Sequence, residues 1–249
     1  MKLHDINIGI VGYGFVGGAL HNWLVNNTEC KVLISDPPKN INDDLSNCDV
    51  IFISIHIPTE MDGTQDLTLL KSIIQNLPNC PIFIRTTVMP GICDSLAKEF
   101  NKEIYFMPEF LTERTANEDF ASQDLVVCGA IDIMDTIFTK KNKLYMSNME
   151  AEIAKYAHNS FGALKVTYFN AIYDICEKNN LNYNNVRDGI LLSKYISPTH
   201  TMVPGPDGKL GYGGKCFPKD ISAFSHFCDK HILADILNIV MKANSTFRK

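Results

Sequence analysis

The sequence predicts an α/β fold in which a mostly parallel sheet is followed by a long central helix and a small all-α domain. Two observations lead to this fold class. From residue 5 to about 147, short β-branched runs alternate with amphipathic stretches of helical length, which is typical of a parallel sheet covered by helices. After Ser147 the strand patterns stop, and apolar residues keep near-helical spacing from about Met149 to Asn179. The predicted domains are therefore 1–147 and 148–249.

The strands expected in the first domain are nearly continuous apolar runs, which fits burial on both faces of a sheet. The helices between them are expected to begin near Phe15, Leu67, Gly91 and Asp132. The strand candidates are the runs INIGIV, KVLIS, DVIFISI, PIFIRTT, IYFM, DLVVC and KLYM.

The helical pattern at 149–179 is longer than one small domain usually needs. It predicts a spine that joins two regions or a dimer interface. The alternative is that Asn159-Ser160 or Gly162 divides it into two helices. Further helices are expected near 183–194, 218–229 and 231–245, with the irregular run SPTHTMVPGPDGKLGYGG after the first of them.

Composition excludes several classes of protein. The 249 residues are 45% hydrophobic, enough for one large domain or two ordinary ones. With a net charge of −5 and scattered basic residues, no basic stripe exists for nucleic acid. No apolar run approaches the ~20 residues of a membrane span, and no cleavable signal pattern is visible, so we expect a cytoplasmic protein without a membrane partner.

The eight cysteines contain no Cys-x-x-Cys pair, which argues against a zinc ribbon. We therefore expect no metal site, and we expect thiols in a reducing cytosol. Cys216 differs from the other cysteines because glycines and polar residues surround it instead of a periodic apolar pattern.

The run IGIVGYGFVGGAL places Gly12-x-Gly14-x-x-Gly17 directly after a strand and at the start of a helix. Glycines there permit a tight turn and let backbone amides approach a pyrophosphate, as in Rossmann-like domains. Asp36 ends the second strand about 20 residues later, where a carboxylate accepts hydrogen bonds from ribose hydroxyls and repels a 2′-phosphate. The predicted cofactor is therefore NAD, although a glycine turn with a surface aspartate would give the same pattern.

Later strand ends in an open α/β sheet face the same crevice, which adds the runs HIPT, RTTVMPG and MPEF to the site. The predicted cofactor-binding residues are Gly12, Tyr13, Gly14, Phe15, Val16, Gly17, Asp36, Pro58, Thr59 and Thr86.

Two pairs of residues four apart carry the expected chemistry. Lys155 and Asn159 share one helix face, where they would supply donors for a developing oxyanion, although a solvated polar stripe is the ordinary explanation. Cys216 and Asp220 show the same spacing at the start of a predicted helix, whose N-terminus favours a thiolate. Asp220 opposes that effect unless it orients a lysine or a water, and Lys219 is most simply a surface residue.

These motifs together resemble the UDP-glucose/GDP-mannose dehydrogenase family. GYGGKCFPKD resembles its active-site signature, and AEIAKYAHNSF resembles its central helix. MPEFLTE resembles its substrate loop, and RTTVMPG resembles its threonine loop on the cofactor side. The resemblance runs from residue 5 to about 245.

The resemblance implies a four-electron oxidation of a nucleotide-sugar primary alcohol, such as that of UDP-glucose, to a uronic acid with two NAD molecules. Cys216 would attack the intermediate aldehyde, and the thiohemiacetal would be oxidised to a thioester that water hydrolyses. The implied catalytic residues are Cys216, Lys155, Asp220, Asn159, Glu109 and Thr87. The implied substrate-binding residues are Phe110, Leu111, Glu113, Tyr212 and Gly213.

The chain also departs from the family pattern. It resembles a short form that lacks the C-terminal nucleotide-sugar-binding domain, and its first domain is short after Asp36. The run PGPDGKL adds residues before the signature, and SKYISPTHTMVPG holds no arginine to match one by which a neighbouring subunit often contacts substrate. A homodimer through the central helix, or a separate nucleotide-binding chain, would complete the pocket.

Two other functions remain open at this point. A two-electron dehydrogenase of the 3-hydroxyacid or 6-phosphogluconate type also uses a lysine and an asparagine one helical turn apart, but it does not need Cys216. A non-catalytic module that binds NAD or a nucleotide sugar, or a subunit of a split enzyme, is the other alternative.

Overall fold

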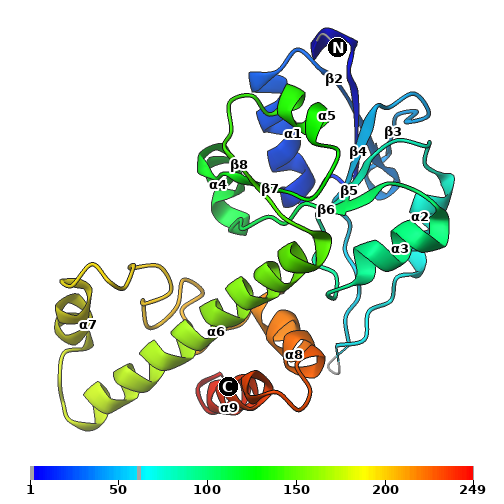
Figure 1. Ribbon diagram of the computed structural model, residues 1–249. Coiled ribbons are helices and arrows are strands. Elements are labelled where there is room, and N and C mark those ends of the chain that lie inside the picture. The colour runs from blue at the N-terminus through cyan, green and yellow to red at the C-terminus, as the bar shows by residue number, and fades with distance from the viewer. Residues whose placement is uncertain (1–2, 61–62, 249) are drawn as a thin grey trace. The chain divides into compact units, whose positions relative to one another are not determined.

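The computed structural model describes residues 3–60 and 63–248 (Figure 1). It contains two compact units, Met1–Pro58 with Gln65–Lys155, and Thr59–Thr64 with Tyr156–Lys249. The division between the units falls inside one long helix, so this helix contributes to both. The domain boundary at 147/148 stays a prediction.

The first unit contains a six-stranded sheet in the order β3-β2-β1-β4-β5-β6. All neighbours pair in parallel except β3, which is antiparallel to β2. Because β2 and β4 lie on opposite sides of β1, the chain order reverses at β1, and a ligand crevice is expected outside the carboxyl ends of β1 and β4. The strands are β1 (Asn7–Val11), β2 (Lys31–Asp36), β3 (Ile41–Asn42), β4 (Val50–Ile53), β5 (Ile82–Ile84) and β6 (Ile104–Phe106).

A second, two-stranded parallel sheet joins β7 (Leu125–Val127) to β8 (Lys143–Tyr145). Every strand expected from the sequence is present, and the mostly parallel α/β architecture is confirmed. The two-residue β3 was not predicted because it is too short to show a period of two.

Helices cover both faces of the large sheet (Figure 1). One face packs against α1 (Phe15–Asn27), α4 (Ala116–Ser122) and α5 (Ile131–Ile137), and the other against α2 (Thr68–Asn76) and α3 (Ile92–Phe100). Alternate residues of β4 enter the two cores, Phe52 on the first face and Ile51 and Ile53 on the second. This burial on both faces explains the continuous apolar strands.

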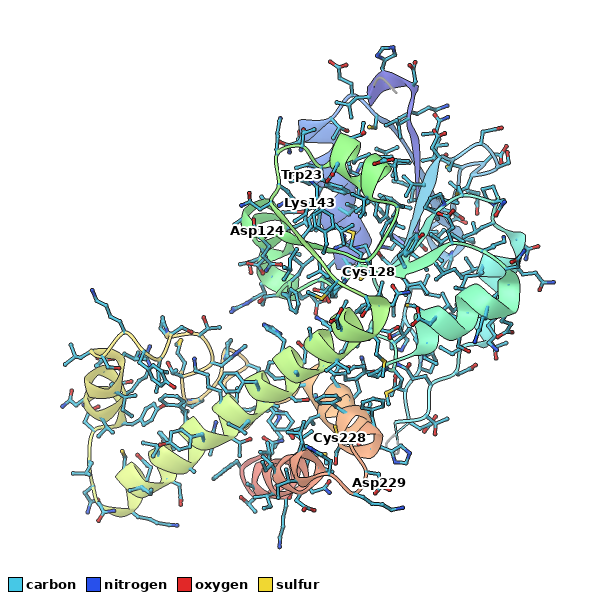
Figure 2. All side chains as sticks on the ribbon, in the orientation of Figure 1. Trp23, Asp124, Cys128, Lys143, Cys228 and Asp229 are labelled. Carbon is cyan, nitrogen blue, oxygen red and sulfur yellow. The ribbon has the colours of Figure 1, made fainter. Side chains whose placement is uncertain are left out.

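The core of the first face is rich in aromatic residues. Trp23 of α1, which Figure 2 labels, lies in this core. Its ring stacks on Phe138 with ring centroids 5.2 Å apart and meets Phe120 of α4 edge-on at 6.1 Å. The seven-residue α4 was not predicted because only two of its side chains, Ala116 and Phe120, are buried. Three short 3-10 turns, Leu3–Asp5, Pro37–Lys39 and Glu113–Thr115, complete the unit.

Most of the regular structure of the second unit is helical. The helix α6 (Asn148–Lys178) begins in the first unit and continues without interruption for 31 residues, so the alternative of two separate helices is wrong. Gly162 lets the Phe217 ring pack on α6, because a Cβ there would lie 2.7 Å from Phe217 Cζ. The other helices are α7 (Tyr183–Leu191), α8 (Phe217–Phe227) and α9 (Ile232–Phe247).

Two groups of side chains hold the second unit together. Phe169 and Cys176 of α6 form a small core with Tyr183 of α7. Tyr156 of α6 stacks on Phe224 of α8 with ring centroids 5.6 Å apart, and α8 packs against α9. Within residues 3–60 and 63–248, no helix is long and apolar enough to span a bilayer.

Candidate active site

The glycines of the turn after β1 differ in the reason that each position lacks a side chain. Gly12 has a φ of 87°, and a Cβ there would lie 2.5 Å from the Ser54 carbonyl oxygen at the end of β4. A Cβ at Gly17 would lie 2.1 Å from the Gly12 carbonyl oxygen, so only a residue without a Cβ lets α1 approach the turn this closely. A Cβ at Gly14 would meet nothing within 4 Å. The turn therefore leaves space over Gly14.

The residues around this turn fit a bound dinucleotide. No side chain caps α1, which begins at Phe15 and continues through Val16, so its first-turn N–H groups remain suited to a pyrophosphate. The carboxylate of Asp36, the last residue of β2, accepts a hydrogen bond of 2.8 Å from the Tyr13 N–H. The predicted acid therefore lies beside the predicted turn.

Lys39 is a member of this cluster that sequence reasoning missed. Its Nζ lies 3.9 Å from Asp36 Oδ2 and 5.7 Å from the Tyr13 ring centroid, and it donates to the Tyr13 carbonyl oxygen. The signal in the sequence that could have indicated Lys39 was its position three residues after Asp36.

The threonine loop after β5 is held by hydrogen bonds within the first unit. The Thr86 hydroxyl donates to the Ile55 carbonyl oxygen at 2.7 Å. Gln65, which sequence reasoning missed, donates to the Thr87 carbonyl oxygen at 3.2 Å and accepts from the Met89 N–H at 2.8 Å. These bonds fix the loop, and the Thr86 hydroxyl proton is already donated to a backbone carbonyl.

The boundary between the two units falls within the HIPT run, between Pro58 and Thr59. The Pro58 carbonyl oxygen accepts from the Asp66 N–H at 3.0 Å within the first unit, whereas Thr59 belongs to the second.

Lys155 and Glu109 form a buried ion pair. Lys155 is 4% exposed, and its Nζ donates to the Glu109 carbonyl oxygen and lies 3.2 Å from Glu109 Oε1. The same Nζ lies 5.3 Å from the Phe110 ring centroid. The Leu111 N–H donates to Glu109 Oε2 at 2.6 Å, whereas Glu113 is exposed. Lys155 is therefore not part of a solvated polar stripe.

The cysteine site lies in the second unit. Cys216 is exposed at the N-cap of α8, and its carbonyl oxygen accepts from the Asp220 N–H at 2.9 Å. Asp220 is 1% exposed and accepts from Asn159 Nδ2 at 2.6 Å. Its other oxygen pairs with Lys219, so Lys219 is not simply a surface residue. His158, another residue missed from the sequence, lies with Nδ1 3.0 Å from Asn159 Oδ1.

Two glycines of GYGG make room for side chains of the C-terminal segment. A Cβ at Gly211 would lie 2.5 Å from Asn244 Oδ1, and one at Gly213 would lie 2.2 Å from Arg248 Nη2. A Cβ at Gly214 would meet nothing within 4 Å. Sequence reasoning missed Asn244 and Arg248, which lie more than thirty residues away along the chain.

Asn244 fixes the approach to the cysteine by two hydrogen bonds to Tyr212. Its Oδ1 accepts from the Tyr212 N–H at 2.7 Å, and its Nδ2 donates to the Tyr212 carbonyl oxygen at 3.1 Å. Tyr212 is buried, and this burial raises its pKa to about 12, so the hydroxyl stays protonated at neutral pH.

Comparisons with known proteins agree with this arrangement. Residues 20–147 match the NAD binding domain, and residues 149–246 the central domain, of the UDP-glucose/GDP-mannose dehydrogenase family. The UDP-glucose 6-dehydrogenase of Rickettsia typhi is 30% identical over 96% of this chain and 67% of its own length. The UDP-glucose dehydrogenase of Pyrobaculum islandicum, at 22% identity, has the same fold with a TM-score of 0.80 over 97% of this chain and 68% of that one. The GDP-mannose dehydrogenase of Pseudomonas aeruginosa, at 20% identity, gives 0.65 over 96% and 68%.

The chain spans about two thirds of the length of these relatives. The alignment with the Rickettsia typhi protein covers 294 positions although this chain has 249 residues, so that relative carries residues inside the matched region that this chain lacks. Both matched domains nevertheless occur here in the family's order. The chain therefore belongs to the UDP-glucose/GDP-mannose dehydrogenase family of NAD-dependent dehydrogenases and carries its NAD binding domain and its central domain.

Proposed function

We propose that this protein oxidises the primary alcohol of a nucleotide sugar of the UDP-glucose kind to the uronic acid, with Cys216 as a covalent nucleophile. One observation carries the proposal. An exposed thiol stands at the N-terminus of α8, one turn before a buried Asp220 that Asn159 and Lys219 hold in place. A two-electron dehydrogenase has no use for such a thiol.

The proposed reaction has four steps. The alcohol loses a hydride and a proton to give the aldehyde, and the Cys216 sulfur adds to the aldehyde carbon to give a thiohemiacetal. Loss of a second hydride and a proton gives the thioester, and water then releases the uronic acid and restores the thiol. NAD, when bound, accepts one hydride in each oxidation, so each sugar reduces two NAD molecules.

The roles proposed for the polar groups are those that the resemblance to the family implies. Lys155 stabilises the oxygen that becomes negative, and Asp220 holds the hydrolytic water. Asn159 orients the sugar, and Thr87 positions the same water. Glu109 removes a proton from the water, a type of step that contributes roughly 10²- to 10⁴-fold to rate.

The remaining predicted residues bind the two ligands. The open space over Gly14 and the first turn of α1 receive the pyrophosphate, and Asp36 receives the ribose. The predicted substrate contacts are Phe110, Leu111, Glu113, Tyr212 and Gly213. Tyr212 is buried and Asn244 holds both of its main-chain polar groups, so its role is to fix the course of the backbone before Cys216.

We also propose a homodimer through α6. Phe161, Tyr168 and Ile175 are 64%, 55% and 52% exposed and recur every seven residues along the helix. This repeat puts them on one stripe, and an exposed apolar stripe is typical of a helix that packs against a partner. A separate nucleotide-binding chain is the alternative partner. Sedimentation of wild type and Phe161→Asp distinguishes them, because only the homodimer dissociates in a sample of this chain alone.

The test of the function is NADH formation with a panel of nucleotide sugars. We expect wild type to form two NADH per sugar and Cys216→Ser to stop at or before the first. Cys228→Ser is the matched control, since Cys228 lies at the other end of α8, and it should keep both (Figure 2).

Two results would contradict the proposal. One NADH per substrate with full activity in Cys216→Ser indicates a two-electron dehydrogenase. NAD binding without turnover on any sugar indicates a binding module.

A further inference from the structure

Arg85 is a buried cation whose charge is not satisfied in the structure. It follows β5 and is 1% exposed. Its Nε and Nη2 have no hydrogen-bond partner, and its Nη1 reaches only the Met107 sulfur at 3.8 Å. Burial of an ion without hydrogen bonds is costly, and buried polar groups in native proteins are normally paired. This guanidinium therefore calls for an explanation.

The neighbouring Lys141 shows that the surrounding core can satisfy a cation. Lys141 is 8% exposed, and its Nζ donates to the carbonyl oxygens of Phe120, Ala121 and Gln123 at the C-terminal end of α4. Arg85 and Lys141 both lie 5.0 Å from the Phe120 ring centroid. The structure thus pairs one of two adjacent buried cations and leaves the other with open donors.

The open donors of Arg85 have a defined geometry. Nε–H and Nη2–H lie on the same edge of the planar guanidinium, and this edge binds a carboxylate through two parallel hydrogen bonds. The unsatisfied atoms are therefore the pair that recognises a carboxylate.

Glu109 is the carboxylate that acts on Arg85. Ile84 of β5 pairs with Phe106 of β6, so Arg85 follows in register with Met107, two residues before Glu109. Burial lowers the pKa of Arg85 to about 10, and the charge of Glu109 opposes this shift. Arg85 consequently stays charged at neutral pH.

In the proposed reaction, Glu109 and Lys155 act on different groups and separate. Their side chains lie 3.2 Å apart and are 10% and 5% exposed. Lys155 must turn to the substrate oxygen, and Glu109 must face the hydrolytic water. Separation of the pair would leave a buried carboxylate without a cation, which is strongly unfavourable.

We propose that Arg85 is a positioning residue that receives the Glu109 carboxylate on its Nε–H and Nη2–H edge when Lys155 turns to the substrate. This inference rests on the proposed function, because it assigns separate roles to Lys155 and Glu109. Arg85 touches neither the substrate nor the reacting carbon, and it acts through Glu109.

The experiment uses Arg85→Met, which keeps an unbranched apolar stem and removes the guanidinium and its charge, with Arg85→Lys and Lys141→Met for comparison. We expect Arg85→Met to lower kcat of the two-NADH reaction by about 10- to 100-fold, which corresponds to the loss of hydrogen bonds to a charged group. The KM for NAD should stay unchanged. Arg85→Lys should recover part of kcat, since it restores the charge but not the two-donor edge.

Stability separates this role from a structural one. Because Arg85→Met removes an unpaired buried charge, its midpoint of urea unfolding should equal or exceed that of wild type. Lys141→Met should lower the midpoint, since three carbonyl oxygens lose their donor.

A double-mutant cycle gives the decisive readout. Since Arg85 acts through Glu109, Arg85→Met should change kcat less than about threefold in a Glu109→Gln background. Three results would overturn the inference. They are a full additive loss of kcat for Arg85→Met in the Glu109→Gln background, a wild-type kcat in Arg85→Met alone, and a lowered unfolding midpoint in Arg85→Met. Wild type that fails to form two NADH per sugar refutes the proposed function itself, and the inference with it.

Discussion

Gly12 of the nucleotide turn and Gly18 of α1 should respond in opposite ways to substitution by alanine. Gly12→Ala adds a Cβ 2.5 Å from the Ser54 carbonyl oxygen at a φ of 87°, whereas Gly18→Ala adds one inside α1 with nothing within 4 Å. The left-handed backbone costs about 1–2 kcal/mol, and the overlap with a strand end costs about 1–3 kcal/mol. Gly18→Ala should stabilise by about 1 kcal/mol through helix propensity. The two variants should therefore differ by about 3–6 kcal/mol.

Urea unfolding followed by tryptophan fluorescence measures this difference directly. Trp23 is the one tryptophan of the chain and lies on α1, in the core of the first unit (Figure 2). NADH binding, followed in the same samples, should weaken in Gly12→Ala and persist in Gly18→Ala. If the free energies of unfolding of the two variants differ by less than about 1 kcal/mol, the close approach of β4 to the turn does not constrain Gly12, and the reasoning is refuted.

Two further predictions concern the second unit and the thiols. Asn244→Ala should lower the free energy of unfolding by about 2–4 kcal/mol, because two buried backbone groups of Tyr212 lose their partners. A urea titration followed by circular dichroism measures this loss, and a loss below about 1 kcal/mol contradicts the prediction. Iodoacetamide at pH 8 should modify the exposed Cys216 first, because burial raises the pKa of Cys48 to about 11 and that of Cys128 to about 12. Cys48 and Cys128 should react only as pH rises toward those pKa values, and peptide mapping that finds either labelled before Cys216 is the contrary result.

Periodicity was sufficient to predict the fold where elements are long or fully buried. The continuous apolar runs of β4 and β5 gave their strands, and the near-helical spacing of 149–179 gave α6. The possible break at Gly162 was wrong because this glycine makes room for the Phe217 ring and does not end the helix. Elements as short as β3 and α4 carry too few residues to show a period.

Residue spacing predicted contacts along one element but not between distant ones. The position of Cys216 at the start of α8 follows from local sequence. The Lys155–Glu109 ion pair joins residues 46 apart, and no local pattern indicates it. The buried charge of Arg85 was equally invisible, because a lone arginine after a strand is usually exposed. Tertiary packing alone decides which polar residues are buried and paired.

The most direct test of the account is the chemical state of the Cys216 sulfur during turnover. Wild type mixed with NAD and a nucleotide sugar, quenched in acid within one turnover and digested, should yield the Cys216 peptide carrying the sugar as a thioester. Cys228 peptides from the same digest should carry nothing. A quenched enzyme that has formed two NADH per sugar and never bears the sugar on Cys216 would contradict covalent catalysis by this thiol.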